Sequence, residues 1–364
     1  MISDNLCTPY KTGRLVVEPS LVPGRFDSHF VDAPYVFKWG DKYYMTFIGW
    51  DSIGYRTGLA TSYDLLNWTN EGMIIDRGPA GSPTEYNVAL TWILRDNDLF
   101  GDGSLRQVEG RFLGTYHAYP NPGMEEGSAS IGLCWSDDLR NWQLDDPFLH
   151  CDDPDAGDWE RGGLYKSCIL EHDGVYYMFY NAKQRIQHPW NEQTGLVTSP
   201  DLKRWTRAAN HPVLANGGPG SPDEIFASDP CVLRMEDKWV MFYFGLASDG
   251  HARECAALSD DLIHWEKIDK PMIDIGSPGE IDSTHAHKPS VISRNGVLID
   301  VGLPGEVDST HAAKPSMVSC DGVLYHFYCA TAPAEEGSMG EIDYPERRGI
   351  ALATSVVVSP IPSD

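Results

Sequence analysis

Ser62-Tyr-Asp-Leu-Leu-Asn-Trp68 is the first of four stretches with the pattern Ser-x-Asp-Leu-x-x-Trp; the others are Ser136–Trp142, Ser199–Trp205 and Ser259–Trp265. Successive copies are 60 to 74 residues apart, and self-similarity at a near-constant period is typical of repeat architectures. A residue that recurs in every repeat serves the scaffold, because it cannot be unique to one site. We therefore expect the aspartate to cap a turn and the tryptophan to pack between neighbouring repeats.

Each repeat also contains two stretches with strand chemistry. The first is a short apolar run, and the second is a polar turn followed by aromatic and β-branched residues, which favour strands. The second stretch occurs five times, at 41–47, 110–116, 174–180, 237–243 and 322–328. The sequence therefore predicts an all-β fold, a five-bladed β-propeller of four-stranded antiparallel blades. A final apolar run at 349–355 has no Asp-Leu-x-x-Trp after it and lies where a ring of repeats would close.

Composition favours one domain over residues 1–364, with the propeller over roughly 25–355, because 41% hydrophobic content is ample for a core. The first residues lack the basic and apolar regions of a signal peptide, so we expect a cytoplasmic protein with reduced thiols. A net charge of −25 argues against nucleic acid and anionic membranes as partners and fits a neutral substrate such as a sugar.

A tandem duplication interrupts the fifth repeat. Residues 272–298 recur at 298–324 with 18 of 27 positions identical. One inner strand needs only one copy, and the second copy runs directly into the next predicted strand at Tyr325. We favour the second copy as the strand. The first copy would then project near the channel mouth with His285 and His287, over the site or towards a partner subunit, which leaves a homo-oligomer open.

Acidic and basic residues gather where the first strand of each repeat begins. When the strands are aligned on the residue at the proline position, an acid stands seven positions before it in four repeats, as Asp27, Glu160, Asp223 and Asp282, with Glu85 one step off. One or two residues before this proline position the residues differ between repeats: they are Asp32, Lys166, Asp229 and His287. Charged groups in an apolar strand are costly unless they are paired or functional. We therefore place the active site here.

The blade pattern resembles the five-bladed propeller glycosidases, namely glycoside hydrolase family 43 (arabinanases, arabinofuranosidases, β-xylosidases) and its relatives in families 32, 117 and 130. The resemblance implies cleavage of a glycosidic bond by carboxylates at the channel mouth. It implies that Asp32 matches the family 43 base or the family 32 nucleophile, and that Asp229 resembles the Arg-Asp-Pro carboxylate of family 32. Where family 43 has its acid this chain has Lys166, with Glu160 the nearest carboxylate, and a family 43 metal- or water-holding histidine maps loosely to His285 or His287.

We therefore expect a glycoside hydrolase that cleaves a terminal bond, of furanoside, arabinose or xylose type, in a short neutral oligosaccharide. A glycoside phosphorylase and a non-catalytic sugar-binding propeller are the alternatives. The expected catalytic residues are Asp32 as base or nucleophile, Glu160 as acid, and Asp229, which would orient the substrate or tune the acid. The expected substrate-binding residues are Asp27, Trp50, Glu85, Asn87, His117, Lys166, Asp223, Glu224, His285 and His287, with Tyr119, Trp190 and Phe226 as further rim aromatics. No cofactor is expected, and a central Ca²⁺ or other ion is left open without a sequence indication.

Overall fold

The computed structural model of the protein describes residues 10–99, 101, 103–235, 237–250, 252–269, 311–320, 323–333 and 339–354. This part of the chain is all-β apart from a short 3-10 helix, η2 (Asp158–Glu160). The strands are β1 (Tyr10–Val17), β2 (Phe30–Trp39), β3 (Lys42–Trp50), β4 (Tyr55–Ser62), β5 (Thr69–Ile75), β6 (Ala89–Ile93), β7 (Gln107–Val108), β8 (Arg111–Ala118), β9 (Ser130–Ser136), β10 (Trp142–Leu144), β11 (Gly163–His172), β12 (Val175–Lys183), β13 (Glu192–Ser199), β14 (Thr206–Arg207), β15 (Phe226–Met235), β16 (Lys238–Leu246), β17 (Ala252–Ser259), β18 (Glu266–Lys267), β19 (His311–Cys320), β20 (Val323–Pro333) and β21 (Glu346–Thr354).

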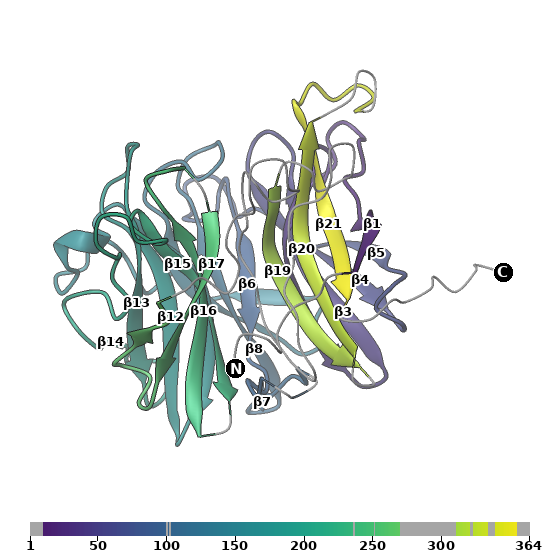
Figure 1. The fold of residues 1–364 in the computed structure, drawn as a ribbon. Helices are drawn as coiled ribbons and strands as arrows, with labels where there is room; N and C mark the ends of the chain where they lie inside the picture. The colour runs from purple at the N-terminus through teal and green to yellow at the C-terminus, as the bar shows by residue number, and fades with distance from the viewer. Residues whose placement is uncertain are drawn as a thin grey trace.

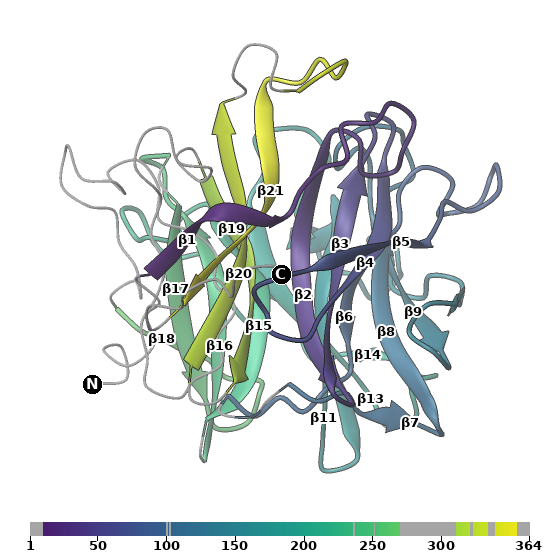
Figure 2. The same ribbon diagram turned by 90° about the vertical axis from the view of Figure 1, so that its right-hand side faces the viewer.

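The strands form sheets in which chain neighbours pair antiparallel, which confirms the all-β prediction (Figures 1 and 2). Two sheets have four strands, in the orders β2-β3-β4-β5 and β1-β21-β20-β19, and one has five, β10-β9-β8-β6 with β7 beside β8. The eight-stranded sheet consists of two antiparallel runs, β11 to β14 and β15 to β18, joined by the parallel pair Glu192↔Phe226.

The two ends of the described chain meet in one sheet. β1 pairs with β21 and forms the edge of this sheet. In the other repeats the edge strand follows the Asp-Leu-x-x-Trp turn, which the last repeat lacks, so β1 takes the place of that strand. In the same sheet β19 pairs with β20, and β19 comes from the second copy of the duplicated segment, as the local connectivity favoured. The first copy, with His285 and His287, lies outside the described residues.

The repeated Asp-Leu-x-x-Trp stretch is a capped turn, as predicted. In its first copy the Asp64 carboxylate accepts the backbone N–H groups of Leu66 and Asn67 at 2.9 and 2.8 Å. The leucine in each copy has a left-handed φ between 61° and 68°. The Trp68 ring packs edge-on against Phe327 of another sheet, with ring centroids 5.3 Å apart. The motif therefore serves both turns and packing between sheets.

The first strands of successive repeats contact one another: β19 with β2, β2 with β6, β6 with β11, and β11 with β15. At their far ends the segment 94–106 crosses between them. Its Leu99 N–H donates to Arg234 O at 2.8 Å, and its Asn97 side chain donates to Val232 O at 3.0 Å. Lys38 N–H donates to Gly103 O at 3.4 Å. The segment thus ties the ends of β2 and β15 together, and leaves the opposite ends of these strands for the site.

Candidate functional site

A cavity of about 240 Å³ lies where β2, β11 and β15 begin. Its lining combines three carboxylates, basic groups and aromatic rings. The polar members are Glu125, Glu192, Asp229, Lys166, His117 and His188, and the aromatic ones are Tyr55, Tyr165, Trp190, Phe226 and Phe244. Apolar and aromatic walls with a few converging polar groups are the usual form of a small-ligand site.

Three of the first strands carry the same backbone irregularity at this cavity. Each has a β-bulge, and the residue in it adopts a left-handed φ: Ala33 at 51°, Lys166 at 49° and Asp229 at 53°. Left-handed φ is uncommon for residues other than glycine, and such strain gathers at functional sites. The bulges therefore aim Lys166 and Asp229 into the cavity.

The bulges correct the equivalence drawn from the sequence. Ala33, rather than Asp32, occupies the position of Lys166 and Asp229, since the register shift in β2 falls between Asp32 and Tyr35. Asp32 stands two residues before the proline of its strand, whereas Asp229 stands one residue before its own, so the two acids were never at the same position. Asp32 is consequently one residue away from the equivalent position.

Asp229 is fixed by Asn181 of β12. The Asn181 side-chain amide donates to Asp229 Oδ1 at 2.6 Å, and its carbonyl oxygen accepts the Asp229 backbone N–H at 2.5 Å. Asn181 is fully buried. The reciprocal pair holds the carboxylate in one orientation toward the cavity.

Glu192 is held by a stack of side chains. The Trp190 indole N–H donates to Glu192 Oε1 at 2.9 Å. The His188 ring stacks on Trp190 with centroids 3.4 Å apart, and the Lys183 ammonium lies 4.5 Å from the Trp190 centroid. The stacked His188 ring fills one face of the Trp190 indole, so the Lys183 ammonium lies on the opposite face of that indole. Glu192 itself is only 7% exposed.

Lys183 is a buried ammonium among three aromatic rings, those of Tyr119, Tyr165 and Trp190. Burial lowers its pKa, because a charged ammonium loses its hydration, while the carboxylates of Glu125 and Glu192 oppose that shift. Burial also raises the pKa of Tyr165 well above its usual value. The ammonium therefore lies within electrostatic reach of two of the cavity carboxylates.

Asp32 lies beside the cavity wall rather than in it. It is 3% exposed, its Oδ1 accepts the Ala33 backbone N–H at 2.6 Å, and its Oδ2 is 3.7 Å from the Arg348 guanidinium. Burial raises the pKa of Tyr55, and Glu125 and Asp32 add to that shift. Asp32 is thus an electrostatic neighbour of the cavity through Tyr55.

The acids seven positions upstream share a different arrangement. Glu160 is fully buried, and its carboxylate accepts from Gly157 N at 2.8 Å, Tyr180 Oη at 2.9 Å and Arg207 Nε at 3.0 Å. Asp223 repeats the pattern with Tyr243 Oη at 3.0 Å and with Lys267. In each case the acid ties the loop before the first strand to the last strand of the same antiparallel run, β14 for Glu160 and β18 for Asp223.

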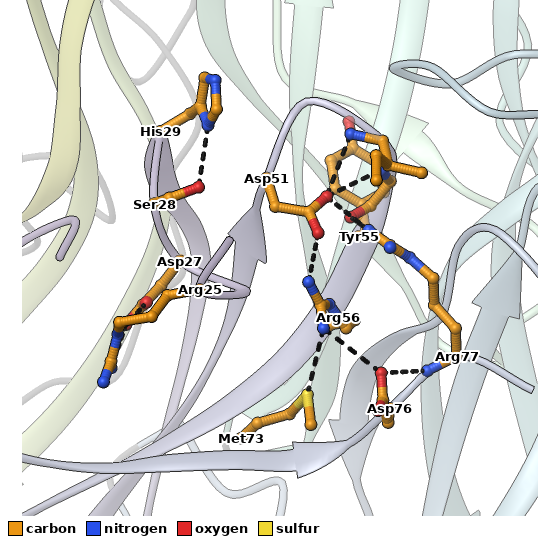
Figure 3. Close-up of polar contacts among 12 residues, drawn as sticks. Arg25, Asp27, Ser28, His29, Asp51, Tyr55, Arg56, Met73, Asp76 and Arg77 are labelled. Carbon is orange, nitrogen blue, oxygen red and sulfur yellow. Dashed lines mark hydrogen bonds and ion pairs between the residues drawn. The ribbon is translucent and has the colours of Figure 1, made fainter. Parts of the chain in front are cut away.

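Asp27 makes the third such tie: it pairs with Arg25 at 3.0 Å (Figure 3). It also accepts the Asn70 side-chain amide of the outermost strand β5 at 3.2 Å. None of Asp27, Glu160 and Asp223 is among the cavity-lining residues. The structure therefore does not bring the expected acid, Glu160, to the cavity.

The remaining predicted residues support loops. Glu85 and Glu224 occupy matching Gly-Ser-Pro loops and accept the N–H groups of Gly81 at 2.7 Å and Gly220 at 3.1 Å. The Asn87 carbonyl oxygen accepts from Tyr55 N at 2.7 Å. Trp50 is buried against Phe30 with ring centroids 5.7 Å apart, and neither ring lines the cavity.

Asp51 anchors the loop that leads into Tyr55. It pairs with Arg56 and with Arg77, one on each carboxylate oxygen, and Figure 3 shows it above Arg56 and beside the Tyr55 ring. Burial would raise the pKa of Asp51, but hydrogen bonds from Arg77 and the backbone lower it. This ion-pair cluster holds one wall of the cavity.

Of the predicted residues, the structure brings His117, Lys166 and Asp229 together in the cavity lining, with the rim aromatics Trp190 and Phe226. Glu125, Glu192 and Lys183 were not predicted, because they lie outside the first strands on which the sequence pattern drew attention. A signal for Glu192 was present: a charged residue begins the third strand of its repeat, close to a tryptophan.

Among the described residues no group of three or more histidine, cysteine or acidic side chains is placed to hold a metal ion. In that same part of the chain no helix is long and apolar enough to cross a membrane.

Comparison with known proteins gives a family match. The model of the family described as "Glycosyl hydrolases family 32 N-terminal domain" matches residues 105–291. A 1,2-beta-oligomannan phosphorylase of Thermoanaerobacter sp. (strain X514) is 27% identical over 42% of this chain and 43% of its own length. A fructan 1-exohydrolase of Triticum urartu is 29% identical over 44% of this chain and 27% of its own. The chain therefore matches less than half the length of these curated relatives.

Similar solved structures extend over nearly the whole chain. A "Glycoside hydrolase" has a TM-score of 0.74 and 27% identity, covering 99% of this chain and 95% of its own. A thermostable family-43 glycoside hydrolase, at a TM-score of 0.52 and 18% identity over 91% of this chain and 95% of its own, shares the fold. The chain is thus a relative of the propeller glycosidases, with hydrolases and a phosphorylase among its relatives.

Proposed function

The chain belongs to the glycosyl hydrolases family 32 N-terminal domain family, and on this premise we propose that it hydrolyses a terminal glycosidic bond in a short neutral oligosaccharide. The observation that carries the proposal is one cavity lined by Glu125, Glu192 and Asp229 among aromatic rings. Glycoside hydrolysis needs two carboxyl groups on opposite sides of the scissile bond, and stacked rings suit the faces of sugars. A furanoside of arabinose or xylose type stays the preferred substrate.

We propose that residues 1–364 form a single five-bladed propeller domain, with the cavity at one end of its axis. The support is the division of the eight-stranded sheet at its parallel pair, and the five first strands, β2, β6, β11, β15 and β19, which all carry a register shift. A cytoplasmic location, and contact between copies through the duplicated segment, stay predictions.

We assign the base or nucleophile to Glu192. Its carboxylate is buried, oriented by Trp190 and within electrostatic reach of the Lys183 ammonium, which favours the ionised form. Asp229, which Asn181 fixes, would orient the substrate, one of the two roles expected for it from the sequence. Asp32 acts through Tyr55 in this scheme, as a positioning residue.

The general acid is then Glu125. It stands on the loop after β8, is half-buried, and reaches the cavity from its rim, where a leaving group would depart. It would protonate the glycosidic oxygen as the bond to the anomeric carbon breaks. Either a water deprotonated by Glu192, or the Glu192 carboxylate itself followed by water, would then bond to that carbon. Glu160 is replaced in this role because three donors already occupy its buried carboxylate.

A phosphorylase is the second candidate function. Its support is Lys166, which lines the cavity, with the 1,2-beta-oligomannan phosphorylase among the relatives. In that reaction inorganic phosphate takes the place of water and the product is a sugar 1-phosphate.

A substrate panel with and without phosphate tests the proposal. Purified protein would be incubated with nitrophenyl arabinofuranosides, xylosides, fructosides, galactosides and mannosides and with the matching oligosaccharides. We expect free sugar to be released at a rate that phosphate does not change. Release of sugar 1-phosphate only with phosphate would establish the second candidate, and binding without turnover by folded protein would overturn both.

A further inference from the structure

Arg95 is a buried charge at the end of the first strands opposite the cavity. It follows β6 in the segment 94–106 and is only 2% exposed. Its guanidinium carbon lies 5.1 Å from the Trp92 ring centroid and 5.5 Å from that of Tyr35. This group has no part in the proposed catalysis.

The hydrogen-bonding edge of Arg95 is unpartnered among the described residues. Nη1 reaches Val36 O at 3.4 Å, and a side chain at Gly103 would lie 3.1 Å from that same nitrogen. Nε and Nη2 are buried and have no hydrogen-bond partner within the described ranges, and neither has the indole N–H of Trp92. In that part of the chain no carboxylate pairs with Arg95, although other arginines use the same edge: Arg25 binds both oxygens of Asp27 through Nε and Nη2.

The described surroundings offer no internal counter-ion. An arginine cannot lose its proton, and burying an unpaired charge costs far more than burying a paired one. Arg95 acts electrostatically on the thiol of Cys168, but burial raises the pKa of that thiol, so it stays neutral. The ring faces of Tyr35 and Trp92 attract the cation, whereas Nε–H and Nη2–H point within the guanidinium plane and require an acceptor.

We propose that Arg95 binds a small monovalent inorganic anion, of the chloride class, between its Nε–Nη2 edge and the base of the first strands. A monovalent ion balances the single charge, and a small one loses little contact with the apolar walls. A bulk charge of −25 repels anions from the surface, so binding requires a buried cation such as this one. The anion would stabilise the joint between segment 94–106 and the first strands, and would leave the catalytic cavity untouched.

The test compares the melting temperature of the full chain in sodium chloride, bromide and gluconate at equal ionic strength, since gluconate is a bulky organic anion and not of the chloride class. Binding to the folded state alone should raise the melting temperature of the wild type by about 2 °C for each tenfold increase in halide above its dissociation constant. Arg95→Met should lose this halide-specific rise. Asp102→Asn is the matched control: this acid is close in sequence but outside the described residues, and its removal should leave the halide response intact.

A direct measurement does not depend on the variant folding. Crystals of the wild type grown in bromide should give an anomalous peak within hydrogen-bonding distance of Arg95 Nε and Nη2. Equal melting temperatures in halide and gluconate, or no such peak at saturating bromide, would overturn the proposal. Loss of stability in Asp102→Asn without any halide response would do the same, because the chain itself would then neutralise Arg95.

Discussion

Substitution of Glu160 distinguishes a structural role of this residue from the role of general acid. The change is Glu160→Gln, which keeps the size of the side chain, removes its charge and replaces one accepting oxygen with an NH2 donor. The carboxylate is fully buried and accepts three hydrogen bonds, one of them from an Arg207 side chain that is 6% exposed. Breaking a buried ion pair by removing one partner costs about 3 to 5 kcal/mol.

The cost should fall at the lower end of that range, since Arg207 keeps Asp153 at 3.2 Å and Asp155 at 2.7 Å as partners. Tyr180 would also lose a charged acceptor. Its ring lies against Gly195, where an added Cβ would come within 2.3 Å of it, so it cannot swing away to find another. We expect a loss of about 3 kcal/mol in the free energy of unfolding and a rate per folded molecule within about threefold of the wild type.

The assay pairs urea unfolding, followed by tryptophan fluorescence, with kcat/KM corrected for the folded fraction. Asp223→Asn is the matched control, because it breaks the equivalent tie to Tyr243 and Lys267. It should cost less, since the Lys267 side chain is 30% exposed. A Glu160→Gln protein as stable as the wild type, but more than about a hundredfold slower, would refute the structural role and restore Glu160 as the acid.

Four further outcomes are expected. Asp138→Ala should lower the free energy of unfolding by about 1 kcal/mol, the usual cost of a lost capping side chain, measured by urea titration. Backbone hydrogen bonds lower the folded-state pKa of Asp138 and lower that of Asp201 to about 2, so their stabilisation should persist above about pH 4 and disappear as the pH falls toward 2; acid unfolding unchanged in an Asp138→Asn, Asp201→Asn double variant would contradict this. Lys183→Met should move the acidic limb of the kcat/KM profile to higher pH, because the ammonium that favours ionised Glu192 is gone, and Lys183→Arg should restore it; identical profiles would remove Lys183 from the scheme. Deletion of residues 272–297 should leave a folded protein, since β19 comes from the second copy, and loss of folding with retention after deletion of 299–324 would reverse the choice of strand.

The fold could be predicted from the features that all repeats share, whereas the site depends on positions at which the repeats differ. The Ser-x-Asp-Leu-x-x-Trp stretches predicted turns and inter-sheet packing correctly, because the hydrogen bonds of Asp64 are local and the same chemistry recurs in every copy. The exact residue that each first strand presents to the cavity could not be predicted in the same way. It is set by the bulge, and Asp32 precedes the bulged residue of β2 whereas Asp229 is the bulged residue of β15.

Long-range contacts explain why the roles of Glu160 and Glu192 could not be predicted from the sequence. Glu160 and Asp229 are both acids near the start of a first strand, and only the position of Arg207, 47 residues later in the chain, distinguishes a buried tie from a cavity group. Glu192 begins the third strand of its repeat and is oriented toward the cavity by Trp190, on which Lys183 lies. These three residues have no spacing that recurs in other repeats. Sequence patterns identify such residues only when their partners are local.

The most direct test of the central claim is the kcat/KM of Glu192→Gln on the best substrate of the panel, corrected for the folded fraction. Glutamine keeps the shape and can still accept the Trp190 N–H bond, so the fold should survive while base or nucleophile is lost. We predict a loss of at least about a hundredfold, the lower end of the range for a general base. A variant within about tenfold of the wild type would contradict the assignment of this cavity as the active site.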